Sequence, residues 1–199
     1  MCALMMILVL TLSACGGGGG SEAEEKLTEV RGNYLEMTAC SGHADLTADY
    51  GRRVYTYGID FNWQREGETL LTITAPELVA GTVAHISAGE TALEYDGTML
   101  ETGPLDPAGL SPVDALPALF AYAREGFAAE CAMEEAEGEA KKLRVICRDP
   151  ESEPGAGREA ELLFDGTTGA LLGGELSQDG FTVIQCDISG FVMTLPPEQ

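Results

Sequence analysis

The segment Arg-Val-Tyr-Thr-Tyr-Gly-Ile-Asp-Phe-Asn-Trp-Gln, residues 53–64, alternates large apolar side chains with small or polar ones. Five successive odd-numbered positions carry the large apolar set: Tyr55, Tyr57, Ile59, Phe61 and Trp63. Side chains of a β-strand point alternately to its two faces, so this period of two predicts a strand with one buried face. A strand of this kind is typical of an antiparallel sheet that packs a core on one side only.

Shorter runs with the same period occur on both sides of this segment and predict roughly ten strands in all. The expected runs cover residues 43–50, 53–64, 69–74, 82–86, 91–95, 98–101, 127–135, 141–148, 159–165, 170–177 and 181–193. Asp96-Gly97 and Asp179-Gly180 are hairpin signals between neighbouring runs. The strands follow one another without β-α-β alternation, which favours an antiparallel meander.

Two segments have a helical period instead. The stripe of residues 24–37 consists of Leu27, Val30, Tyr34 and Met37. Residues 111–125 begin with Ser111-Pro112, a typical helix start, and Pro117 predicts a kink or a division there. Their apolar stripe includes Leu116, Leu119 and Phe120. We therefore expect an α+β fold, a curved antiparallel half-open β-barrel whose concave face is covered by both helices.

The first twenty residues have a different character. An apolar run at 4–10 is followed by Leu12-Ser13-Ala14-Cys15 and then by five glycines. The run is too short to span a bilayer but has the length of the apolar core of a secretory signal. Leu-Ser-Ala-Cys resembles the bacterial lipobox, a resemblance that implies cleavage before Cys15 and diacylation of this cysteine.

The resemblance implies three parts: a signal peptide at 1–14, a lipidated Cys15 with a Gly-rich tether to residue 23, and a domain at 24–195. It also implies attachment to the cell membrane on its extracytoplasmic face. Met1-Cys2-Ala3 lacks the Lys or Arg that precedes the apolar core of a signal, so we expect the natural start a few codons upstream. The alternative is a misplaced start followed by a low-complexity linker.

Charge limits the partners of the domain. The chain has 33 acidic and 11 basic residues, a net charge of −22, and none of these lies in residues 1–15. Such a charge repels the phosphate backbone, so nucleic acid is not an expected partner. The membrane is expected as a partner through the lipid anchor, and the sequence leaves the oligomeric state open.

Four cysteines remain in the domain: Cys40, Cys131, Cys147 and Cys186. Four cysteines in an exported domain suggest two disulfides. The preferred disulfide is a cross-strand pair of Cys131 with Cys147, on the two runs joined by the turn at 137–139, which leaves Cys40 to pair with Cys186. The alternative is that all four are small buried hydrophobic residues.

The sequence contains little that indicates catalysis. It has no Gly-x-Ser-x-Gly motif, no Cys-x-x-Cys motif and only two histidines, His43 and His85. Acidic residues are so frequent that any pair could be proposed as an acid and a base, so their presence is uninformative. We therefore expect a protein that is not an enzyme and that has no metal site and no cofactor.

The order of elements resembles the LolA/LolB and LppX/LprG superfamily of lipoprotein carriers. The local similarity lies in the last third of the chain. It comprises Leu163-Phe164-Asp165, Thr168-Gly169, Leu172, Glu175, Asp179-Gly180-Phe181-Thr182-Val183 and Ile188-Ser189-Gly190-Phe191. The resemblance implies an unclosed half-barrel with helices as a lid over a hydrophobic cavity, and carriage of acyl chains.

We therefore expect a surface lipoprotein that binds or transfers acyl chains or another hydrophobic ligand. The expected ligand contacts are the aromatic strand face and the second helix: Tyr55, Tyr57, Ile59, Phe61, Trp63, Leu116, Leu119 and Phe120. Two alternatives stay open on the same fold. One is an envelope sensor or protein-interaction module without a lipid, and the other is a structural lipoprotein with a filled core.

Overall fold

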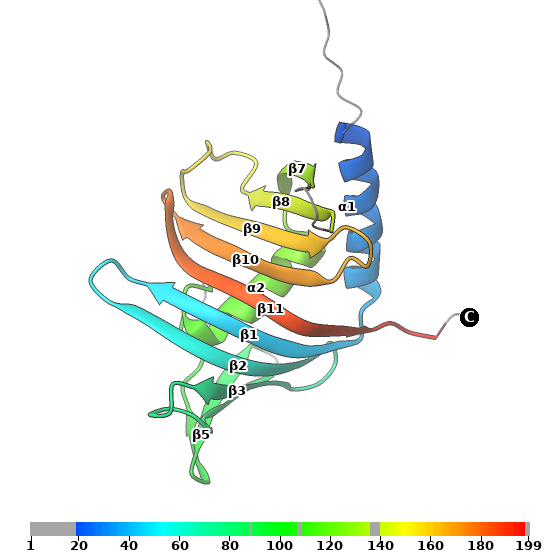
Figure 1. Ribbon diagram of the computed structural model, residues 1–199. Helices are drawn as coiled ribbons and strands as arrows, with labels where there is room; N and C mark the ends of the chain where they lie inside the picture. The colour runs from blue at the N-terminus through cyan, green and yellow to red at the C-terminus, as the bar shows by residue number, and fades with distance from the viewer. Residues whose placement is uncertain (1–18, 88, 107–108, 136–139, 198–199) are drawn as a thin grey trace, which may run out of the picture.

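The computed structural model describes residues 19–87, 89–106, 109–135 and 140–197. Its eleven strands form one antiparallel sheet in the order β6-β5-β4-β3-β2-β1-β11-β10-β9-β8-β7 (Figure 1). The two end strands, β6 and β7, do not pair with each other, so the curved sheet stays unclosed. The predicted half-open barrel is confirmed, with one strand more than the rough count of ten.

The elements in chain order are α1 (Gly19–Glu36), β1 (Ala39–Asp49), β2 (Val54–Gln64), β3 (Thr69–Ala75), β4 (Val83–Ser87), β5 (Glu90–Tyr95), β6 (Thr98–Glu101), α2 (Pro112–Glu125), β7 (Ala128–Glu134), β8 (Lys142–Arg148), β9 (Arg158–Asp165), β10 (Leu171–Gln178) and β11 (Phe181–Thr194). Strands β1–β6 make one meander and β7–β11 make a second. The two meanders join where β1 pairs with β11, from Ala39 opposite Thr194 to Ala48 opposite Ile184.

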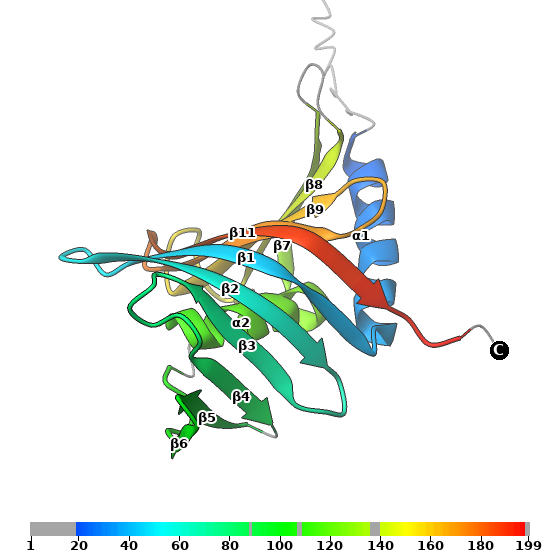
Figure 2. The same ribbon diagram turned by 60° about the horizontal axis from the view of Figure 1, so that its bottom comes forward.

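Both helices lie on the concave face of the sheet (Figures 1 and 2). Helix α1 packs against β7, β8 and α2, whereas α2 packs against β1, β9 and β10. The predicted stripes are the buried faces: Val30, Tyr34 and Met37 are at most 1% exposed, and Leu27 is partly buried. Each such side chain contributes about 1.5–3 kcal/mol when it leaves water.

Helix α2 begins as the sequence predicts. The Ser111 hydroxyl accepts a hydrogen bond from the Asp114 amide at 3.1 Å, which satisfies one of the free N–H groups of the first turn. The helix is one continuous element from Pro112 to Glu125, so Pro117 does not divide it in two.

Helix α1 begins at Gly19, five residues before the predicted start, so the last glycines of the expected tether belong to the helix. The rest of the N-terminal predictions concern the signal peptide at 1–14, Cys15 and the glycines that follow it. These residues lie outside the described ones and stay predictions. In the described part of the chain, no helix is long and apolar enough to cross a membrane.

The alternation of large apolar and small or polar side chains in β2 extends beyond the part of the strand that packs against the core. Ile59 and Phe61 are buried, but Tyr55 is 39% exposed, so its predicted burial is wrong. Strand β2 pairs with β3 only from Gly58 to Asn62. At Tyr55 the strand β2 is therefore an edge of the sheet, because no β3 residue pairs with it there, whereas Ala48 opposite Tyr55 also pairs with Ile184 of β11. The turn of the β1–β2 hairpin, at residues 50–53, projects beyond the rest of the sheet (Figure 2), and we call it the projecting arm.

The predicted disulfides are wrong for a geometric reason. Cys131 lies opposite Val145, and Cys147 lies opposite Ala128, because the β7–β8 register is centred one position earlier than the predicted pairing requires. Cys186 lies opposite Leu46, six residues along β1 from Cys40, which is roughly 20 Å at 3.3 Å per residue. A disulfide needs Cα atoms within about 7 Å of each other.

All four cysteines of the described chain are free thiols. Burial raises the pKa of Cys40 and Cys186 to about 12, and it also raises the pKa of Cys147. Cys131 is the one partly exposed member of the set, and its pKa is raised first by desolvation and next by Glu24.

We expect iodoacetamide at about pH 8 to alkylate Cys131 first and the other three only after denaturation, since the thiolate is the nucleophile. Intact-mass spectrometry of the chain from residue 21 onward checks this. Cys131→Ala should remove the fast adduct. Masses about 2 Da low per pair, with no added label after denaturation, would instead demonstrate disulfides.

Candidate functional site

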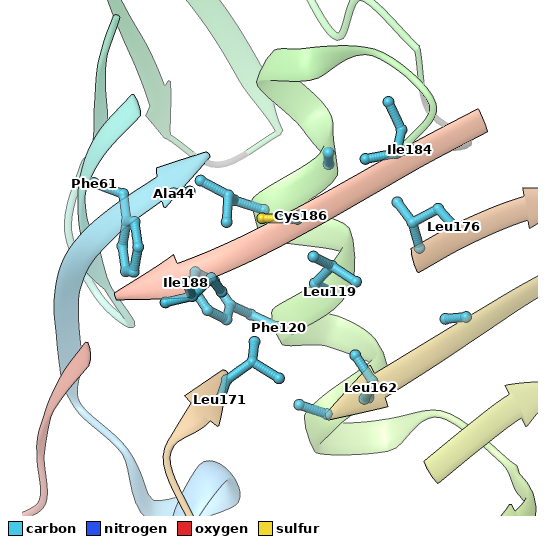
Figure 3. Packing of buried hydrophobic residues seen from close by; sticks show 14 of the residues in the cluster. Ala44, Phe61, Leu119, Phe120, Leu162, Leu171, Leu176, Ile184, Cys186 and Ile188 are labelled. Carbon is cyan, nitrogen blue, oxygen red and sulfur yellow. The ribbon is translucent and has the colours of Figure 1, made fainter. Parts of the chain in front are cut away.

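The space between α2 and the sheet is filled by aromatic and aliphatic side chains. The Phe120 ring lies 5.6 Å from that of Phe61, 6.2 Å from that of Trp63 and 6.4 Å from that of Phe191, measured between centroids. Leu119 and Phe120 point from α2 toward the sheet residues Phe61, Ile188 and Leu171 (Figure 3). This cluster is the centre of the core.

The structure brings most of the predicted ligand contacts into this cluster. Ile59, Phe61, Leu116, Leu119 and Phe120 are at most 4% exposed. Tyr57 and Trp63 are partly buried against the same core, and Arg124 lies over the Trp63 ring at 5.9 Å. Tyr55 is the exception, because it lies where β2 is an edge of the sheet without a β3 residue beside it.

A groove borders this core where α2 faces the strands β4 and β5. Its volume is about 220 Å³. It is lined by Ile86, Gly89, Thr91, Pro104, Asp106, Gly109, Asp114, Pro117 and Ala118. In Figure 2 the strands β4–β6 bend below the rest of the sheet and leave α2 on their concave side. We call this hollow the α2 groove.

An apolar row crosses the sheet beside the α2 groove. Cross-strand pairing connects Phe61 to Leu71, Leu71 to Ala84, Ala84 to Leu93 and Leu93 to Leu100. The first three are buried, Leu93 is partly buried, and Leu100 is 63% exposed. The concave face therefore offers a continuous apolar path from the core to the outer strand of the sheet.

The polar groups of the α2 groove are carboxylates rather than cations. One oxygen of Asp114 accepts hydrogen bonds from the Asp106 amide and from the Ser111 hydroxyl, each at 2.6 Å. Among the described lining residues, none is Lys, Arg or His. The mouth of the groove thus combines apolar walls with negative charge at the start of α2.

The loop that enters α2 is fastened to the projecting arm. The Tyr50 hydroxyl donates a hydrogen bond at 2.9 Å to the Leu110 carbonyl, one residue before the helix cap. Burial raises the pKa of Tyr50, with further contributions from neighbouring tyrosines and Asp106. Gly109 has a φ of +79°, a conformation that glycine adopts without strain. The Tyr50 contact and the glycine turn therefore add to the hydrogen bonds of Ser111 and Asp114 in holding the start of α2.

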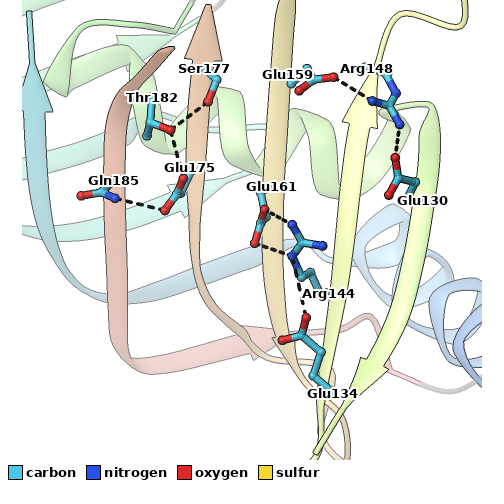
Figure 4. Close-up of polar contacts among 10 residues, drawn as sticks. All are labelled: Glu130, Glu134, Arg144, Arg148, Glu159, Glu161, Glu175, Ser177, Thr182 and Gln185. Carbon is cyan, nitrogen blue, oxygen red and sulfur yellow. Dashed lines mark hydrogen bonds and ion pairs between the residues drawn. The ribbon is translucent and has the colours of Figure 1, made fainter. Parts of the chain in front are cut away.

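The convex face of the sheet is polar. Arg144 makes two hydrogen bonds to Glu161, at 2.6 and 2.5 Å, and lies 3.8 Å from Glu134 (Figure 4). Arg148 bridges Glu159 and Glu130 on the strands at either side. These ion pairs connect β7, β8 and β9. Both guanidinium groups are bonded to glutamates of the protein itself.

Each histidine of the chain lies between two carboxylates on this convex face. His43 Nδ1 is 2.6 Å from Asp60, and this hydrogen bond is the main reason that the pKa of His43 is raised. His85 contacts Glu68 and Glu94, each at 3.0 Å. Within the described ranges, no three His, Cys, Asp or Glu side chains are arranged to hold a metal ion.

Solved structures share this fold. An uncharacterized conserved protein from Thermus thermophilus aligns over 88% of this chain and 90% of its own, with 8% identity and a TM-score of 0.51. LprF from Mycobacterium bovis aligns over 91% and 99%, with 14% identity and a TM-score of 0.50. A LolA superfamily protein from Nitrosomonas europaea aligns over 90% and 95%, with 11% identity and a TM-score of 0.41. No protein-family model and no curated protein sequence matches the chain.

Sequence reasoning identified the core side of the site and missed its mouth. The α2 groove depends on how the loop before Ser111 sits against β4 and β5, which involves contacts between residues far apart in the chain. The sequence contains a weak signal for this mouth. The loop with Pro104, Asp106 and Gly109 has few apolar side chains and leads directly into a capped helix.

Proposed function

We propose that this protein is an envelope lipoprotein without a catalytic step. It would bind an acyl chain, or another hydrophobic ligand of similar width, between α2 and the concave face of the sheet. The observation that carries the proposal is the α2 groove, an apolar opening that borders a helix whose inner stripe is wholly apolar. The chain would enter at Ile86 and Ala118 and continue along the row toward Phe61.

The filled core sets a condition on this binding. Moving Leu116, Leu119 and Phe120 into water would cost about 5–9 kcal/mol, at about 1.5–3 kcal/mol for each side chain. A chain of about 15 methylenes gains about 0.8 kcal/mol per buried CH₂, or about 12 kcal/mol in total. Burial of the alkyl chain would therefore offset the cost of moving α2 away from the sheet. Without a ligand this cost is not offset, so α2 would stay packed against the sheet.

The position of the domain follows from the proposed anchor. A lipid on Cys15 would hold α1 close to the membrane through only a few residues. With no charged side chain in residues 1–15, the large negative charge lies entirely on the part of the chain that follows Cys15. The domain would then remain soluble beside the membrane and exchange ligands with it. Replacing Cys15 by Ser should release the protein from the membrane fraction.

Filling the α2 groove tests the proposal. Ala118 lines the groove from α2, so Ala118→Phe should reduce ligand uptake by at least tenfold by occupying the entrance. The measurement is native mass spectrometry of the chain from residue 15 with Cys15→Ser, purified without detergent and incubated with monopalmitoylglycerol. Wild type should carry one adduct of ligand mass.

Ala121→Phe is the matched control, because Ala121 lies on the exposed side of the same helix. It should leave the adduct unchanged. Ile86→Trp narrows the groove from β4 and should repeat the loss without crowding Gly109. A wild-type chain that takes up no ligand, or an Ala118→Phe chain that binds as well as wild type, would contradict the proposal.

A second candidate is a protein-interaction module with no lipid. The observation in its favour is apolar exposure on the outer strands: Tyr95 is 54% exposed and Leu100 63% exposed, and both lie on the concave face. Exposed apolar side chains on an edge strand are typical of contact surfaces. If Leu100→Ser removed a partner and left lipid uptake intact, this second function would be favoured.

A further inference from the structure

We infer that the α2 groove selects amphiphiles whose head group carries no net negative charge. The inference rests on the proposed function and concerns the chemistry of the head group. It comes from the start of α2, which forms part of the groove mouth through Asp114 and Pro117.

A helix start normally attracts anions, because its first N–H groups have no partner and the helix dipole is positive there. Here the chain supplies its own anion. The Ser111 hydroxyl accepts from the Asp114 amide, and the Asp114 carboxylate in turn accepts from that hydroxyl and from the Asp106 amide. The first turn of α2 therefore already carries a carboxylate of the chain itself, whose charge repels a phosphate or carboxylate head placed beside it.

The charge of the groove lining has one sign. Its charged residues are Asp106 and Asp114, and none of its described lining residues is basic. Like charges that lie a few residues' width apart repel each other, and they do so more strongly near a protein surface than in bulk water. Since 1.4 kcal/mol is a factor of ten in affinity, an anionic head beside Asp114 should bind about tenfold more weakly or worse.

Apolar walls remain available for the alkyl chain, so the discrimination concerns the head alone. Ile86, Pro104, Pro117 and Ala118 present no charge. A neutral or zwitterionic head would place hydroxyl or cationic groups beside the carboxylates, where both are tolerated. The expected ligands are thus neutral glycerides, glycolipids or zwitterionic lipids.

The experiment compares palmitoyl amphiphiles that differ only in the head. The probes are monopalmitoylglycerol, palmitoyl lysophosphatidylcholine and palmitoyl lysophosphatidylglycerol, each titrated below its micelle concentration into the chain from residue 15 with Cys15→Ser. We expect the dissociation constant of the anionic probe to exceed that of the neutral probe by about tenfold or more at low salt. Added salt should narrow this ratio, because it screens exposed charges.

Asp114→Asn tests the assignment, because asparagine can still accept the bond from the Asp106 amide while removing the charge. It should shrink the ratio several-fold. Asp60→Asn is the matched control, since it removes the same charge from the convex face, where Asp60 contacts His43. It should leave the ratio unchanged.

The outcomes separate this inference from the proposed function. If no probe binds, the proposed function fails. If all three bind equally, the proposed function stands and the head-group inference is overturned. If Asp60→Asn shrinks the ratio as much as Asp114→Asn does, the discrimination comes from the net charge of the whole domain, which also overturns the assignment to the groove mouth.

Discussion

Phe120→Ala is expected to lower the free energy of unfolding by about 3–5 kcal/mol, the usual cost of deleting a buried aromatic ring. Phe120 is 1% exposed, and its ring contacts Phe61, Trp63 and Phe191 together. Its removal leaves a cavity that three rings from β2 and β11 cannot fill without moving. Urea unfolding, followed by tryptophan fluorescence of Trp63, measures the loss.

Phe127→Ala is the control, because Phe127 follows the same helix and is 55% exposed. Its effect should stay within about 0.5 kcal/mol, the range of most surface substitutions. A loss below about 1 kcal/mol for Phe120→Ala would mean that the aromatic cluster collapses easily. Helix α2 would then contribute far less to the fold than its burial suggests.

Gly174→Ala is the second large effect, expected at about 1–3 kcal/mol or more because the added methyl group meets backbone. A Cβ at Gly174 would lie 2.7 Å from the Glu161 carbonyl oxygen on β9 and 2.8 Å from a methyl group of Leu119 on α2. The glycine thus lets β10 pass close to both neighbours. The change should lower the midpoint of thermal unfolding by several degrees.

Gly32→Ala provides a control of opposite sign. Gly32 lies in the middle of α1, is exposed, and has no atom within 4 Å of its would-be Cβ. Alanine there should stabilise the protein by about 0.5–1 kcal/mol, because glycine is unfavourable in a helix interior. If Gly174→Ala and Gly32→Ala change the stability in the same direction, close packing of β10 is not the cause of the effect of Gly174→Ala.

Local patterns predicted most of the fold. The strands and both helices correspond to periodic runs, and the stripes through Tyr34 and Phe120 face the core as expected. These features depend on neighbours within a few residues, which the sequence displays directly. The α+β half-barrel could therefore be derived from alternation and from the two helix stripes.

The errors come from contacts that sequence alone does not fix. Tyr55 follows the alternation perfectly, but burial depends on whether β3 and α2 reach that end of β2. The pairing of Cys131 with Cys147 failed because it requires a hairpin centred on position 139, whereas the strands are centred on 138, the middle of the predicted turn, which puts Cys131 opposite Val145. The α2 groove depends on how the loop residues Pro104, Asp106 and Gly109 pack between α2 and the strands β4 and β5, and no local pattern specifies that packing.

Pairing of β1 with β11 has a consequence for the order of events during folding. The middle of the sheet is made from the first and the last strands of the described chain, 155 positions apart at the Ala39–Thr194 pair. Hairpins within each meander form from nearby residues, whereas this seam cannot form until β11 has been synthesised. Until then, both halves expose the edges that the seam will cover. Circular permutation inside the β6–α2 loop would bring β11 and β1 close together in the sequence and so turn this long-range contact into a local one.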